Sequence, residues 1–135
     1  MTRDEFNAFC GAMTATSHVV QWGGADVWKV GANPGGQTGG KVFAVCGWNE
    51  GEAAFTFKTT PFAFEVLSDM PGLRPAPYLA SRGMKWIQQY AAPGLSDTEL
   101  KDHIEISYRL VALGFSKKKR LELGLGRLAV EDTRR

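Results

Sequence analysis

The chain has 135 residues, of which 44% are hydrophobic and 22% are charged. This length and composition fit one globular domain with a hydrophobic core, and they exclude a wholly disordered chain. The apolar run at residues 42–46 has only five residues, far fewer than the ~20 that span a bilayer, and the polar residues 1–5 are unlike a signal peptide. We therefore expect a cytoplasmic protein with one domain over residues 1–126, followed by a frayed tail over residues 127–135.

The 16 basic and 14 acidic residues are distributed unevenly along the chain. Residues 116–135 contain seven basic and three acidic side chains, which gives this stretch a charge of +4 and leaves the first 115 residues at −2. The positive charge is therefore concentrated near the C-terminal end, where it would attract a polyanion.

The first predicted element is a helix that begins after Thr2. Thr2 and Glu5 have the spacing of a capping box, in which each side chain bonds to the backbone of the other residue. The apolar face of this helix comprises Phe6, Phe9, Cys10 and Met13. That face has to pack on another apolar surface, and we expect that surface to be a sheet.

Three strands are predicted next, at residues 26–30, 41–47 and 53–58. They are rich in β-branched and aromatic residues, and the third alternates apolar and polar side chains. Turn residues at 49–52 join the second strand to the third. Between the first two strands, residues 31–40 contain five glycines and one proline. We interpret them as a flexible hairpin tip and not as a phosphate-binding loop, since no helix opens after them.

A second helix is predicted to begin at Thr60, which is a good N-cap residue, and Pro61, which suits the first helical turn. Its buried stripe is predicted to comprise Phe62, Val66 and Met70. The Pro-Gly pair at residues 71–72 ends this helix.

An extended segment and a fourth strand follow. Residues 73–78 are expected to be extended, because a residue that precedes proline avoids the helical region. The strand is predicted at residues 85–90, with Trp86 and Tyr90 on one face and Ile87 on the other.

The third predicted helix has the strongest signals. Ser96 and Glu99 form a second capping box, and Leu95 with Leu100 has the spacing of a hydrophobic staple. The apolar stripe comprises Leu100, Ile104, Tyr108 and Val111, and Gly114 ends the helix.

A short basic helix over residues 117–123 is predicted last, with Ser116 as its N-cap and Gly124 at its end. The order is thus helix, three strands, helix, strand, helix, helix. Because tight hairpins require antiparallel pairing, we expect an α+β fold in which an antiparallel sheet has its helices packed mainly on one face.

Residues suited to catalysis or metal binding are scarce. For Cys10 and Cys46 we expect two buried free thiols, with a disulfide as the alternative. His18 is expected to be a polar residue at the rim of the sheet and His103 a half-exposed residue of the third helix, and neither has a partner at metal-ligand spacing. There is no nucleophile elbow. We therefore expect no metal, no cofactor and no enzymatic activity.

The clearest candidate site is the run of cations Lys117, Lys118, Lys119 and Arg120. Adjacent positive charges at the start of a helix repel one another and the positive end of the helix dipole, and a bound phosphate would relieve that repulsion. Arg74, Arg82 and Lys85 are candidates to extend this patch. The alternative interpretation is a solvated charged face.

The fifteen aromatic residues provide a second cue. Most are expected in the core, but Trp48 beside a turn and Tyr78 in the proline-rich segment are expected to be exposed. A pocket near Tyr78 and Trp86, or the open face of the sheet, could bind a small ligand or a protein partner. Such an interaction module is our alternative to nucleic-acid binding.

Several segments of the chain resemble the MmcQ/YjbR-like family. They are residues 40–44 (GKVFA), residues 70–79 (MPGLRPAPYL), and residues 106–111 (ISYRLV) leading into residues 115–120 (FSKKKR). Together the resemblance covers about residues 2–125. The chain departs from the family's pattern at the hairpin tip over residues 31–40, which is longer than usual.

The resemblance implies a small bacterial protein with a frataxin-like, or double-wing, α+β fold that binds DNA and has no established enzymatic activity. It matches the cations at residues 117–120 to the family's basic stretch before the last helix, where they would contact phosphates while the hairpin tips act as wings. The likeness to frataxin suggests iron as a rival ligand, but the first helix carries only Asp4 and Glu5 as oxygen ligands. We therefore predict nucleic-acid binding that is weakly selective for sequence.

Overall fold

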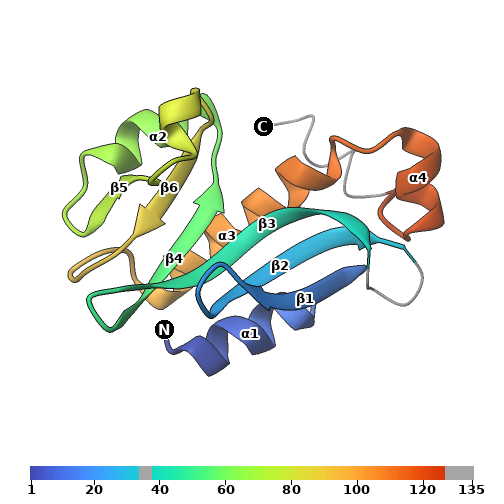
Figure 1. Cartoon of the computed structure of the whole chain (residues 1–135). Helices are drawn as coiled ribbons and strands as arrows, with labels where there is room; N and C mark the ends of the chain where they lie inside the picture. The colour runs from blue at the N-terminus through green and yellow to red at the C-terminus, as the bar shows by residue number, and fades with distance from the viewer. Residues whose placement is uncertain (34–37, 127–135) are drawn as a thin grey trace.

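The computed structural model describes residues 1–33 and 38–126. The described residues form a six-stranded antiparallel sheet in the order β1-β2-β3-β4-β6-β5. The strands are β1 (Thr16–Gln21), β2 (Ala25–Ala32), β3 (Gly39–Asn49), β4 (Glu52–Lys58), β5 (Leu73–Pro75) and β6 (Trp86–Gln89). The helices are α1 (Arg3–Gly11), α2 (Pro61–Ser68), α3 (Asp97–Ala112) and α4 (Lys117–Glu122), with a 3-10 turn, η1, at Ala80–Arg82. The predicted α+β class is confirmed, and α1 and α3 lie on the same side of the sheet (Figure 1).

The helix starts follow the predicted caps. Both capping boxes are formed, by Thr2 with Glu5 at α1 and by Ser96 with Glu99 at α3. The Thr60 side chain accepts a hydrogen bond from the backbone of α2 at 3.2 Å. Local side-chain chemistry therefore sets where these helices begin.

Two strands were missed by the sequence prediction, which counted four. β1 places two valines side by side, so it lacks the alternation that marks a half-buried strand, but it pairs with β2 over its whole length. β5 is only three residues long and includes a proline, so it was predicted only as an extended segment. The predicted glycine-rich tip is also shorter than expected, because Gly31 and Gly40 belong to β2 and β3; the centre of that tip, residues 34–37, lies outside the described residues.

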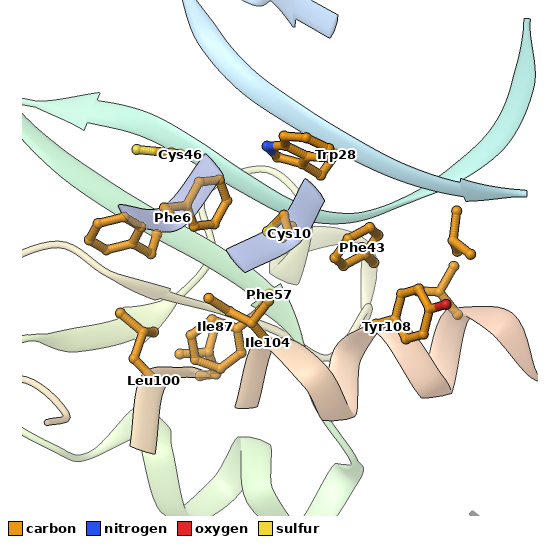
Figure 2. Close-up of a cluster of buried hydrophobic side chains, with 14 of the residues drawn as sticks. Phe6, Cys10, Trp28, Phe43, Cys46, Phe57, Ile87, Leu100, Ile104 and Tyr108 are labelled. Carbon is orange, nitrogen blue, oxygen red and sulfur yellow. The ribbon is translucent and has the colours of Figure 1, made fainter. Parts of the chain in front are cut away.

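The core lies between the sheet and the two long helices (Figure 2). α1 contributes Phe6 and Cys10, and α3 contributes Leu100, Ile104 and Tyr108, as predicted. They meet a layer of fully buried sheet residues that includes Phe43, Cys46, Phe57 and Ile87. Cys10 and Cys46 are both buried free thiols, as predicted.

The predicted buried stripe of α2 is wrong. Phe62 is 80% exposed and Val66 is 50% exposed, whereas Leu67 is buried. α2 contacts β5 and β6 at one edge of the sheet, and it packs there through Leu67 together with Ala63 and Phe64. The helix is apolar on more than one face, so the period of its apolar residues alone does not say which face meets the sheet.

Candidate nucleic-acid interface

α4 presents three lysines on its first turns. It begins after Ser116, whose hydroxyl accepts a hydrogen bond from the Lys119 backbone at 3.1 Å. Lys117 and Lys118 are exposed and Lys119 is half-buried. Within residues 1–33 and 38–126, none of the three forms an ion pair with a carboxylate. Their charges are therefore not neutralised by acidic side chains of the described chain.

Arg120, the fourth cation of the run, has a different environment. Its guanidinium donates to the carbonyls of Leu113 and Phe115, at 3.1 and 2.7 Å. Lys41 approaches the same region, with its ammonium 3.4 Å from the Gly114 carbonyl and 4.9 Å from the centre of the Phe115 ring. Both cations thus donate hydrogen bonds to carbonyls just after the C-terminal end of α3, where the helix dipole favours positive charge. The exposed Lys41 also adds a cation beside α4 that was not predicted from the sequence.

The other three predicted contacts lie elsewhere. Arg74, Arg82 and Lys85 surround β5, η1 and the start of β6, on the opposite side of the molecule from α4 in Figure 1. Arg74 donates to the Gln88 side chain at 2.9 Å, and its guanidinium lies 4.4 Å from the centre of the Tyr90 ring. The seven predicted cations therefore form two groups.

Acidic residues gather at the end of the molecule opposite α4. The N-terminal ammonium lies 2.7 Å from an Asp97 oxygen, which brings the starts of α1 and α3 together. The Arg3 guanidinium lies over the Trp48 ring, which places the β3–β4 hairpin beside them. The carboxylates carried by these three segments are Asp4, Glu5, Glu50, Glu52, Asp97 and Glu99. These acidic residues and the α4 lysines therefore lie at opposite ends of the molecule, and we call the α4 end the basic end (Figure 1). Arg74, Arg82 and Lys85 form a separate group of cations away from it.

The aromatic residues predicted to be exposed are exposed: Trp48 by 46% and Tyr78 by 86%. The predicted pocket paired Tyr78 with Trp86, but Trp86 is only 5% exposed. The Tyr78 ring thus lies in solvent, whereas the Trp86 ring lies beneath the surface.

A buried ionic cluster that was not predicted from the sequence joins α1 to the sheet. Asp26, which is 1% exposed, accepts hydrogen bonds from the Arg3 guanidinium and, at 2.7 Å, from the His18 ring. Burial by itself would raise the pKa of Asp26, but the hydrogen bonds from Arg3 and His18 and the guanidinium charge outweigh it and hold that pKa below its usual value. An aspartate inside an apolar strand was the one available signal, since a buried carboxylate needs partners.

The contribution of this cluster to the free energy of unfolding should depend on pH in the acid range. Asp26→Asn is expected to lower the free energy of unfolding by about 1–3 kcal/mol at neutral pH, because Arg3 loses its carboxylate partner. A carboxylate whose folded pKa is depressed stabilises the protein above its ordinary pKa of 3.8, and that stabilisation disappears as the pH falls through the lower folded value. The difference between variant and wild type in urea unfolding should therefore shrink towards pH 2. Asp69→Asn, at an exposed carboxylate, is the control, and an equal difference at pH 7 and pH 2 would contradict the assignment.

The two thiols are poorly placed to act as nucleophiles. Burial raises the pKa of Cys46 to about 11, and it raises the pKa of Cys10 further. Both thiols are thus protonated at neutral pH. Among the described residues there is also no group of three or more His, Cys, Asp or Glu side chains arranged to hold a metal ion.

No helix in the described part of the chain has the length and apolar character needed to cross a bilayer.

Comparisons with known proteins agree with the fold. The sequence model of the family described as YjbR matches residues 11–110. Among solved structures, the chain is similar to the Deinococcus radiodurans protein DR2400, of the DUF419 domain class, with a TM-score of 0.77 and 22% identity over 92% of this chain and 88% of that one. It is also similar to a Pseudomonas syringae protein, with a TM-score of 0.61 and 20% identity over 82% of this chain and 99% of that one. No curated protein matches the chain.

Proposed function

The chain belongs to the YjbR family, and from this premise and the charge distribution we propose that it binds nucleic acid through the phosphate backbone at its basic end. The observation that carries the proposal is the set of three α4 lysines that no described carboxylate neutralises. Phosphate contacts of this kind position a protein on DNA without reading its sequence. The proposal includes the double-wing mode of binding, a bacterial origin and a cytoplasmic location, and it ascribes no catalytic activity to the chain.

The separation of charge supports an end-on approach. The acidic residues at the starts of α1 and α3 would be repelled by a polyanion, while Lys41 and the α4 lysines would be attracted to it. Arg120 contributes less than the sequence suggested, because it already donates to two backbone carbonyls. Three phosphates neutralised by Lys117, Lys118 and Lys119 correspond to a slope of about −3 for log affinity against log salt concentration on duplex DNA.

A fluorescence anisotropy titration of a labelled DNA duplex over a range of salt concentrations tests this proposal. The variant K117Q/K118Q/K119Q should bind at least about tenfold more weakly at low salt, and its salt slope should fall towards zero because the counterion-releasing contacts are removed. The matched control is R74Q/R82Q/K85Q, which removes the same charge from the other group of cations and should keep the wild-type slope. Absence of binding at tens of micromolar protein in low salt, or an unchanged slope in the lysine variant, would contradict the proposal.

A protein-interaction module is the second candidate, and the exposed side of α2 favours it. Phe62 and Val66 lie one turn apart with 80% and 50% of their surfaces exposed, and together with Pro61 and Glu65 they line a shallow hollow of about 500 Å³. Exposed apolar side chains that cluster in this way are typical of a partner surface. The DNA titration separates the two candidates, because this one predicts no salt-dependent binding to DNA.

A further inference from the structure

The two edges of the sheet differ in how they are protected from pairing with another strand. β5, at one edge, is three residues long and carries Arg74 and Pro75, which are features that discourage edge-to-edge association. β1, at the other edge (Figure 1), is six residues long, contains no proline, lysine, arginine or carboxylate, and pairs with β2 without a bulge. Nothing in its sequence therefore discourages a further strand.

The outward backbone groups of β1 can be identified from its pairing. The Gly31 N–H donates to the Ala15 carbonyl at 2.9 Å, so residues 15 and 31 form a hydrogen-bonded pair next to the strand. Hydrogen-bonded and non-hydrogen-bonded pairs alternate in an antiparallel ladder, and the register here is unbroken. The N–H and C=O groups of Thr16, His18 and Val20 consequently point away from β2. In the described chain, no other backbone segment bonds to them.

We propose that β1 pairs with β1 of a second copy of this chain, antiparallel and about a twofold axis at Val19. In this register His18 of each copy lies opposite Val20 of the other, so that the outward N–H and C=O groups of both residues are satisfied reciprocally. Val19 lies opposite its own symmetry mate, and Ser17 lies opposite Gln21. β1 contains no Lys, Arg, Asp or Glu, so this register places no like charges of those residues opposite each other and forms a self-complementary twofold contact.

The surroundings of β1 are compatible with a second copy. α1 contacts β1, β2 and β3, so it lies over the sheet and not beyond its edge. Val19, Val20 and Trp22 are 37%, 53% and 66% exposed, and pairing would remove apolar surface of all three from water. This inference is independent of nucleic-acid binding, since it uses none of the α4 lysines.

Sedimentation velocity of the full chain, from micromolar to hundreds of micromolar, tests the proposal. The wild type should approach twice the monomer mass as concentration rises. V19K and V19E should each weaken dimerisation by about tenfold, since each places like charges opposite each other at the axis. An equimolar mixture of V19K and V19E should recover the dimer, because the facing charges are then opposite.

The control is M84K, which introduces the same charge at an apolar side chain of similar exposure, 40% against 37% for Val19, and should dimerise like the wild type. Circular dichroism checks that each variant is folded. A wild type that stays monomeric throughout would overturn the proposal. So would a V19K variant that dimerises as strongly as the wild type, or a loss of dimer in M84K alone, which would assign the interface to the segment before β6. Failure of the mixture to recover the dimer would overturn the twofold pairing at Val19.

Discussion

Replacement of Ser107 by alanine is expected to lower the free energy of unfolding by about 2–4 kcal/mol. Ser107 lies on α3 and is completely buried. Its hydroxyl donates to the Phe43 carbonyl at 2.6 Å and accepts from the Lys58 backbone amide at 2.8 Å. The alanine variant would leave both of these groups without a partner, and each unsatisfied buried group costs about 1–3 kcal/mol.

The Ser107 hydroxyl lies where a β-bulge interrupts the pairing of β3. β3 has one extra residue, Phe43, where its register with β2 shifts between Trp28 and Lys29. Its pairing with β4 begins only at Ala44 with Phe57. In an unbroken ladder the next pair would join Phe43 and Lys58 directly; here the Ser107 hydroxyl bridges them. A single side chain of α3 thus completes the hydrogen bonding of the sheet.

Urea unfolding monitored by tryptophan fluorescence measures the effect of S107A. Ser68→Ala is the matched control, because Ser68 is also a helical serine but donates only to the Phe64 carbonyl of its own helix, at 2.5 Å. We expect S68A to change stability by less than about 1 kcal/mol. If S107A proved no more destabilising than S68A, the bridging role would be refuted.

How much of the fold could be predicted from sequence depended on whether the signal was local. The capping boxes at Thr2 and Ser96 lie within one helical turn, so both helix starts were correct. The orientation of α2 was not, because the choice between Phe62 and Leu67 is made by the neighbouring strands and not by the helix. β1 was missed for the same reason, since its pairing with β2 makes it a strand despite weak alternation.

In the candidate site, too, the features with a local sequence signal could be predicted, and those that depend on tertiary contacts could not. The run of cations at residues 117–120 is contiguous, and the structure presents its lysines together on α4. Lys41 is 73 residues from the Gly114 carbonyl that it approaches, and Asp26 draws its partners from α1 and β1. Neither the contact of Lys41 nor the partners of Asp26 could be identified without the tertiary structure. The same holds for Arg120, whose role at the end of α3 depends on how α4 folds back.

The Pro-Gly pair at residues 71–72, within the segment that carries part of the family resemblance, has a structural role. Gly72 has a φ of +88°, and its carbonyl accepts a hydrogen bond from the Tyr90 amide at 2.9 Å. A side chain at this position would place its Cβ 2.2 Å from the Ala91 carbonyl oxygen and 2.8 Å from the Gly94 nitrogen. Both obstacles are backbone atoms, so the chain itself would have to move.

Gly72→Ala is therefore expected to destabilise the fold by more than about 3 kcal/mol, through backbone strain at positive φ and overpacking together. Gly83→Ala is the matched control, because Gly83 has a similar φ of +79° but nothing lies within 4 Å of its Cβ position. That variant should lose only about 1–2 kcal/mol, which is the strain alone. Thermal and urea unfolding of the two variants then isolate the contribution of the close approach. Equal losses in both variants would show that the approach of Gly72 to Ala91 and Gly94 is looser than the structure indicates.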